Sequence, residues 1–137
     1  MKVYLASAFR LIPLVELVAA RLEAAGHTIA VKWWAADGFD LRDKKADNDH
    51  PDVFYTDPVC RWIFDRDFNG VRQADVLVIV AGPEPRAFNG ANVEYGIALA
   101  FGKPCFALGR LDNSAMYFPV QRCGSIEELL RKIWELP

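Results

Sequence analysis

The stretch VLVIVAGPEPRAFNGANVEYGIALAFGKPCFAL (Val76–Leu108) predicts the fold class. It begins with six apolar residues, Val76–Ala81, most of which are β-branched, as is typical of a strand buried on both faces of a parallel sheet. After a loop rich in proline and glycine, a helix is predicted over Gly90–Phe101, with Gly102 directly after its end. A second apolar run, Pro104–Leu108, predicts the next strand. Strand, helix and strand in this order indicate a parallel βαβ unit.

Short strands and amphipathic helices also alternate on both sides of this unit. We therefore expect an α/β fold, namely a single flavodoxin-like, doubly wound domain over residues 1–137 with a five-stranded parallel sheet. The polar segment 35–55 is predicted to be a long loop. The other expected elements are strands at Lys2–Ala6, Thr28–Trp33 and Tyr117–Arg122, a helix at Leu11–Ala25, a helix from Pro58 with apolar residues at Cys60, Phe64, Phe68 and Val71, and a helix from a Ser125 cap to Trp134.

The composition of the chain excludes several classes of protein. With 53% hydrophobic and 25% charged residues, it is not expected to be disordered. The formal net charge of −2 gives no basic excess for binding a nucleic acid polymer. Apolar runs such as Val76–Ala81 and Ile97–Phe101 are too short to cross a membrane.

The chemistry-bearing residue types predict a cytoplasmic protein without a metal or cofactor. The three cysteines are odd in number and form no CxxC pair, which is typical of a reducing compartment, and no leader-like segment precedes the first predicted strand. His27 and His50 lie far apart in the sequence and lack the spacing of metal ligands. The loop Gly82–Gly90 matches neither a P-loop nor a GxGxxG motif.

The predicted topology indicates where a ligand would bind. In doubly wound sheets, ligands lie beyond the carboxyl ends of the strands, at the point where the strand order reverses. This rule places Ser7–Arg10, after the first strand, and Gly82–Gly90, after the third, beside the site. Arg10 either holds a phosphate or flanks the start of a helix. Trp33 and Trp34 either line a base pocket or pack beneath the long loop.

Glu94 is the most informative position for chemistry. It lies near the start of its predicted helix and shares a face with Ile97, Ala98 and Phe101, which we expect to face the sheet. Burying a carboxylate is costly unless the protein uses it, and the helix N-terminus is expected to favour the ionised form that a nucleophile needs. The alternative is that Glu94 is one of the acidic residues commonly found in a first helical turn.

Asp67 and Tyr4 are the next candidates. Asp67 lies at the border of an apolar helical face, although its neighbours Asp65 and Arg66 also fit a solvated charged face. Tyr4 is near the carboxyl end of the first predicted strand. Its hydroxyl either hydrogen-bonds a carboxylate at the reversal point or belongs to an ordinary core aromatic residue.

Three segments resemble one enzyme family. DFNGVRQADVLVIV (Asp67–Val80), GANVEYGIALAFGKP (Gly90–Pro104) and the opening VYLASAF (Val3–Phe9) are similar to the nucleoside 2-deoxyribosyltransferase family, whose relatives include nucleoside 5′-monophosphate N-glycosidases. The most specific feature is the combination of an aspartate before an N-G-V segment with a G-x-x-x-E-x-G-x-A helix start. The resemblance implies that Glu94 is the nucleophile that attacks the anomeric carbon, that Asp67 contacts the leaving base and helps its protonation, and that Tyr4 orients the nucleophile.

The resemblance also implies a substrate-binding set and an oligomer. Phe9 matches an aromatic residue of the base pocket, and Asn113 and Met116 match a segment that a neighbouring subunit contributes, which implies a homo-oligomer with shared sites. Phe88 stands where transferases of the family often have an aspartate. The full set expected to bind substrate is Ser7, Phe9, Arg10, Phe88, Asn89, Gly90, Asn113 and Met116.

These features together lead us to expect an enzyme that acts on a small nucleoside or nucleotide and a nucleobase. Its reaction would be N-glycosidic bond cleavage and 2-deoxyribosyl transfer through a covalent glutamyl-sugar intermediate, because a carboxylate stabilises oxocarbenium character at the sugar carbon. One alternative is hydrolysis of nucleosides or their 5′-monophosphates, in which Ser7 and Arg10 would contact the phosphate and which the departure at Phe88 leaves open. A second alternative is a non-catalytic nucleotide-binding domain.

Overall fold

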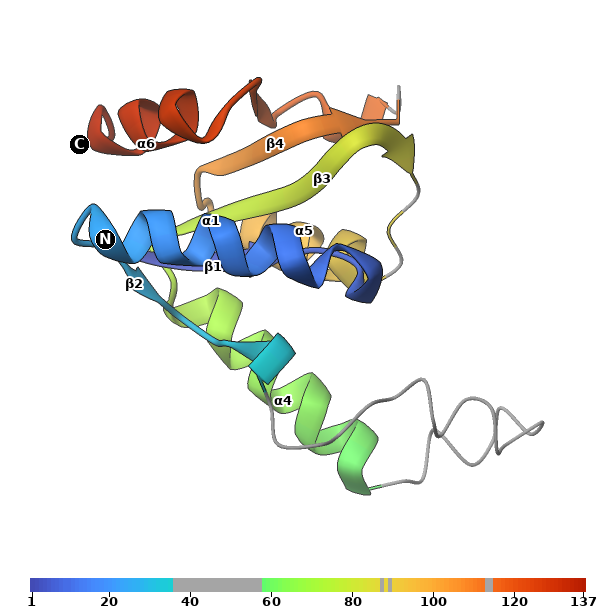
Figure 1. The fold of residues 1–137 in the computed structure, drawn as a ribbon. Helices are drawn as coiled ribbons and strands as arrows, with labels where there is room; N and C mark the ends of the chain where they lie inside the picture. The colour runs from blue at the N-terminus through green and yellow to red at the C-terminus, as the bar shows by residue number, and fades with distance from the viewer. Residues whose placement is uncertain (36–57, 87, 89, 113–114) are drawn as a thin grey trace.

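The computed structural model describes residues 1–35, 58–86, 88, 90–112 and 115–137, except for the side chains at 85, 86 and 116 (Figure 1). Its sheet has five parallel strands in the order β2-β1-β3-β4-β5. This is the flavodoxin-like order, so the predicted fold class is confirmed. The strands are β1 (Lys2–Ala6), β2 (Thr28–Ile29), β3 (Val76–Arg86), β4 (Cys105–Leu111) and β5 (Gln121–Cys123).

Helices cover both faces of this sheet, α1 and α6 on one face and α4 and α5 on the other (Figure 1). The predicted cap of the last helix is confirmed: Ser125 Oγ accepts a hydrogen bond from the Glu128 backbone N–H at 3.1 Å. None of the described helices is long and apolar enough to span a membrane. The helices are α1 (Ile12–Ala24), α4 (Pro58–Gln73), α5 (Gly90–Ala100) and α6 (Ile126–Trp134), and the short 3₁₀ turns are η1 (Phe9–Leu11), η2 (Trp33–Ala35) and η3 (Ala115–Tyr117).

The alternation of side chains along the strands divides the core into two halves. In β3, the side chains of Val76, Val78 and Val80 pack on the α1 and α6 side, and those of the intervening residues pack on the α4 and α5 side. In β1 the same alternation places Tyr4 in the half that faces α4 and α5. The reversal of strand order lies between β1 and β3, so Tyr4 stands at that point in the sheet.

The boundaries of four predicted strands are wrong. The second strand ends at Ile29 rather than at Trp33, because Trp33 turns into η2 and its indole N–H donates to the Leu5 carbonyl oxygen at 2.7 Å. The third strand continues through Gly82 to Arg86, where a loop was predicted, with register shifts along its pairing with β4. The edge strand is Gln121–Cys123 rather than Tyr117–Arg122, since Tyr117 belongs to η3. The fourth strand, predicted at Pro104–Leu108, is Cys105–Leu111. The predicted loop 35–55 lies, beyond its first residue, outside the described residues.

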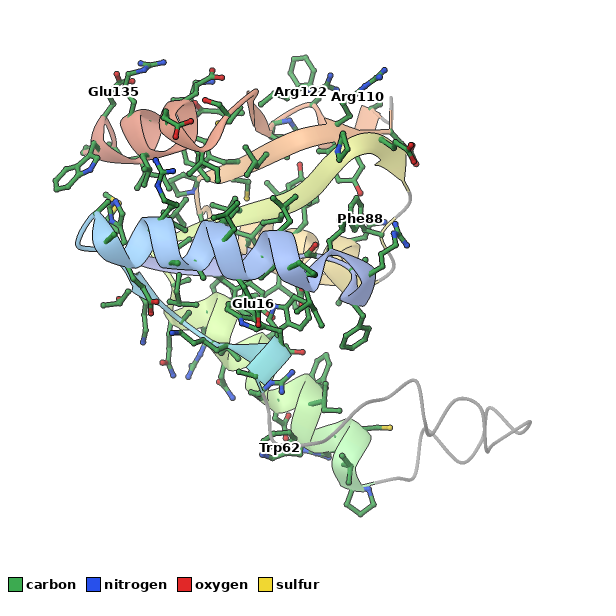
Figure 2. All side chains as sticks on the ribbon, viewed as in Figure 1. Glu16, Trp62, Phe88, Arg110, Arg122 and Glu135 are labelled. Carbon is green, nitrogen blue, oxygen red and sulfur yellow. The ribbon has the colours of Figure 1, made fainter. Side chains whose placement is uncertain are left out.

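The predicted apolar face of α4 is buried only near its C-terminal end. Val71 is fully buried, whereas Phe64 is 55% exposed. Phe64 stacks on Phe68 at a ring-centroid distance of 5.8 Å. Phe68 in turn meets the ring of Phe101, the residue after α5, edge-on. The first half of α4 extends past the sheet, with Trp62 on this outer part (Figures 1 and 2). The helical periodicity was predicted correctly, but only the second half of the helix has a sheet to pack against.

Candidate functional site

A cavity of about 200 Å³ lies at the carboxyl end of β1, beside the reversal of strand order. Segments distant in the sequence enclose it: the turn after β1, the η2 turn, α4 and the start of α5. It is the type of position that topology predicts for a ligand in a doubly wound sheet. The lining residues are Ser7, Phe9, Trp33, Ile63, Arg66, Asp67, Gly90, Ala91 and Glu94.

Glu94 lines the cavity and is held by a hydrogen bond from the sheet. The Tyr4 hydroxyl donates to Glu94 Oε1 at 2.7 Å. Tyr4 is fully buried in β1, and burial together with the nearby Glu94 charge raises the pKa of its hydroxyl, so it remains a donor. A tyrosine on a central strand therefore fixes one carboxylate oxygen of a residue that lines the cavity.

The electrostatics of Glu94 differ from the sequence-based expectation. Burial raises the pKa of Glu94 to about 7, the charge of Asp67 acts in the same direction, and the Tyr4 hydrogen bond and the Arg66 charge oppose it. We expected the helix N-terminus to favour the ionised form, but burial shifts the pKa of Glu94 in the opposite direction, towards the protonated form. Around neutral pH, Glu94 in the free protein is therefore divided between its protonated and ionised forms.

Asp67 is held by an ion pair with Arg66, its neighbour on α4. Arg66 Nε donates to Asp67 Oδ1 at 2.8 Å, and both side chains are 20% exposed. The Arg66 guanidinium also lies over the Trp62 ring, 5.2 Å from its centroid. Among the described residues that line the cavity, Arg66 is the one cation. Adjacent helical residues seldom face each other, so this contact shows that the Arg66 side chain bends across to Asp67.

Aromatic rings and a hydroxyl form the remaining wall. Phe9 meets Trp33 edge-on at a centroid distance of 5.7 Å, and the Trp33 indole is anchored on β1 by its bond to the Leu5 carbonyl. Ser7 Oγ donates to the Val80 carbonyl oxygen at 2.7 Å, which ties the turn after β1 to β3. This wall is apolar and anchored to the strands, as a surface for a planar ring requires.

The structure brings together the central part of the predicted site and separates the rest. Tyr4, Ser7, Phe9, Asp67, Gly90 and Glu94 meet at the cavity. Arg10 is exposed and does not line it, and Phe88 is 2% exposed in the core (Figure 2). Asn89, Asn113 and the side chain of Met116 lie outside the described residues.

Four residues that line the cavity were not predicted from the sequence or had their role left open. Arg66 was grouped with a charged surface face, Ile63 and Ala91 were not considered, and for Trp33 two interpretations stayed open. Trp33 lines the cavity. Trp34 meets the Trp33 ring edge-on and packs, partly buried, against the core. Helical spacing was the available signal for α4, because Arg66 and Asp67 follow Ile63 by three and four residues.

Comparisons with known proteins identify the family and support the fold. The family model for nucleoside 2-deoxyribosyltransferase matches residues 3–128. Among solved structures, the CMP N-glycosidase BcmB of Clostridium botulinum is similar in fold, with a TM-score of 0.58 and 18% identity over 99% of this chain and 100% of that one. The comparison with curated proteins gives no match. Since the family match includes β1, α4 and α5, the chain belongs to the nucleoside 2-deoxyribosyltransferase family and is an enzyme of that family.

Proposed function

We propose that this enzyme cleaves the N-glycosidic bond of a nucleoside through a covalent bond between Glu94 and the sugar C1′, and passes the 2-deoxyribosyl group to a second nucleobase. The observation that supports this most directly is the 2.7 Å hydrogen bond from Tyr4 to Glu94 beneath a cavity that also contains Asp67. Membership of the family supports the reaction class.

The proposed reaction has two steps, and in each a nucleophile attacks C1′ while the group already bound to C1′ leaves. Glu94 Oε2 attacks C1′ while Tyr4 holds Oε1, and the C1′–N bond breaks with its electron pair leaving on the base. Asp67 contacts the departing base and assists its protonation. In the second step a nitrogen of the acceptor base attacks C1′, the Glu94–C1′ bond breaks, and the acceptor's proton leaves towards Asp67. Two inversions at C1′ retain the β-configuration.

The cavity walls suggest how the substrate lies. Phe9 and Trp33 would face the plane of the base, and Ser7 lines the same cavity. Because Asn113 and Met116 resemble a segment that a neighbouring subunit contributes in the family, we infer a homo-oligomer in which another copy completes the site.

Hydrolysis is the second candidate, and one observation favours it. Phe88, at the position where the family's transferases often have an aspartate, is buried in the core and contributes nothing to the cavity wall. Water would then be the acceptor in the second step, with a nucleoside or its 5′-monophosphate as substrate. Because a protein of similar fold is named as a CMP N-glycosidase, an assay should include nucleoside 5′-monophosphates as substrates.

One chromatographic assay separates these functions. Purified protein is incubated with deoxynucleosides, ribonucleosides and their 5′-monophosphates, each with and without a second free base. Transfer predicts a new nucleoside that contains the second base, and hydrolysis predicts free base and free sugar whether or not that base is present. If every substrate remains intact at high protein concentration, both enzymatic functions are wrong, and binding without turnover would indicate the non-catalytic alternative.

The pH dependence of kcat/KM is expected to report the ionisation of Glu94. Attack requires the carboxylate, so kcat/KM should fall below a pH of about 7 and decrease roughly tenfold for each further pH unit. The hydrogen bond from Tyr4 lowers the pKa of Glu94, so Tyr4→Phe should move this acidic limb to higher pH. A pH series of initial rates measures both, and an unmoved limb in Tyr4→Phe would contradict the assignment of the limb to Glu94.

A further inference from the structure

Gly70 of α4 is packed closely against the residue that holds Glu94. A Cβ atom added at Gly70 would lie 2.9 Å from Tyr4 Cε2, 3.2 Å from Tyr4 Cδ2 and 2.5 Å from Val31 Cγ2. Real Cβ atoms do not approach other heavy atoms to less than about 3 Å, so any side chain here displaces a neighbour. Gly70 is buried, and the helix at this point approaches β1 because its Cα carries no side chain.

The two neighbours differ in their freedom to move. Val31 is partly buried in a segment outside the strands, so its methyl groups can shift. Tyr4 is fully buried on a strand with partners on both sides, and its hydroxyl makes the 2.7 Å bond to Glu94. A tilt of its ring would lengthen that bond. If the ring held its place, α4 would have to retreat instead, and Asp67, one helical turn before Gly70, would retreat with it.

We propose that Gly70 is a positioning residue of the active site, whose missing side chain lets α4 lie against the Tyr4 ring so that the Tyr4 hydroxyl stays on Glu94 and Asp67 stays at the same cavity. The inference rests on the proposed function for its kinetic consequence, but its structural content is the alignment of Tyr4 with Glu94. The charged and titratable groups that bear on Glu94 are Tyr4 from β1 and Arg66 and Asp67 from α4.

Gly70→Ala is the direct test, and Gly96→Ala is its matched control. Gly96 is also in a helix, is exposed, and would have nothing within 4 Å of an added Cβ, so its replacement should leave kinetics unchanged. For Gly70→Ala we expect kcat/KM to fall roughly tenfold to a hundredfold and its acidic limb to move to higher pH, as in Tyr4→Phe. A purely structural role for Gly70 would lower the amount of folded enzyme without moving the limb.

A double-mutant cycle tests the route through Tyr4. If Gly70→Ala acts by tilting the Tyr4 ring, it should add little to the shift of the limb that Tyr4→Phe already produces. Additive shifts would overturn this route. If Gly70→Ala does not fold, Gly70→Ala combined with Val31→Ala removes the shorter contact and keeps the contact with Tyr4, and Val31→Ala alone is the reference. A double variant with the limb and kcat/KM of Val31→Ala would overturn the proposal.

A measurement without turnover separates this proposal from the proposed function. In carboxyl-labelled protein, the Glu94 signal is assigned by its absence in Glu94→Gln and titrated by NMR. The proposal predicts that Glu94 titrates at higher pH in Gly70→Ala than in the wild type and in Gly96→Ala. If Glu94 titrates at higher pH in Gly70→Ala but the protein turns over no substrate, only the proposed function is refuted. If the protein turns over substrate but the titration of Glu94 is unshifted, only the role of Gly70 is refuted.

Discussion

Glu94→Gln is expected to reduce turnover roughly a thousandfold or more, because glutamine keeps the shape of the side chain and cannot form the bond to C1′. Base release and base exchange should be lost together, since both begin with the same bond. Initial rates with the best substrate from the chromatographic assay measure this loss. Glu16→Gln, an exposed change on α1, is the control and should leave the rates unchanged. Activity of Glu94→Gln within about tenfold of wild type would refute Glu94 as the nucleophile.

The same substitution is expected to stabilise the protein, and only at higher pH. Glu94 has its pKa raised from 4.5 to about 7, so the folded state favours the protonated group more than the unfolded state does. As the pH rises through this interval the wild type loses stability, on the order of 3 kcal/mol. Glutamine has no charge to bury, so Glu94→Gln should gain this amount relative to wild type.

Urea unfolding at about pH 5 and about pH 8 measures this effect. The difference in unfolding free energy between Glu94→Gln and wild type should grow from the first pH to the second, while Glu16→Gln tracks the wild type. A variant that gains nothing at the higher pH would show that Glu94 is as well solvated in the folded state as in the unfolded state. The kinetic and thermodynamic results together would identify a group whose burial opposes stability and serves chemistry.

Asp67→Asn is expected to reduce turnover of a natural substrate by roughly a hundredfold to a thousandfold, which is the usual range for loss of a proton-transferring group. The size of the loss should depend on the leaving group. A base that departs readily without a proton needs little help, so with such a substrate the variant should approach the wild-type rate. The substitution should preserve most of the packing, because the side chains of aspartate and asparagine have nearly the same volume.

Asp65→Asn is the matched control for Asp67→Asn. Both aspartates lie on α4 beside arginines, but Asp65 is 53% exposed in its pair with Arg61 and does not line the cavity. Rates measured over a series of substrates with progressively better leaving bases should show a steep dependence in Asp67→Asn and the wild-type dependence in Asp65→Asn. An equal loss across the whole series would indicate that Asp67 binds substrate and plays no part in protonating the base.

The strong features of the fold were predictable because they depend on patterns local in sequence. The buried strands β1, β3 and β4 appear as apolar runs, and the Ser125 cap appears as a pair of polar residues three apart. Trp33 was assigned to a strand because its residue type favours one. Its indole bonds to the Leu5 carbonyl 28 positions away, and no local pattern signals such a contact.

The site divides in the same way. Helical spacing placed Glu94 on the buried face, and Ala98 is fully buried as expected, but Phe101 on the supposed same face is 49% exposed because α5 ends before it. The sign of the pKa shift at Glu94 could not be predicted from sequence, because the loss of solvation depends on how tightly neighbouring elements close around it. The closeness of Gly70 to Tyr4 depends on the distance between α4 and the sheet, which residue types alone do not set.

The two carboxylates that line the cavity come from different elements. Glu94 lies on α5 and accepts a hydrogen bond from Tyr4 of β1. Asp67 lies on α4, whose first half projects beyond the sheet (Figure 1). In the proposed reaction, a substitution at Ile63, the residue of the projecting half that lines the cavity, would reshape the side near Asp67 and leave the contact between Tyr4 and Glu94 in place. Over evolutionary time, descendants of one ancestral gene could come to accept new bases in turn while they inherit an unaltered bond-breaking apparatus.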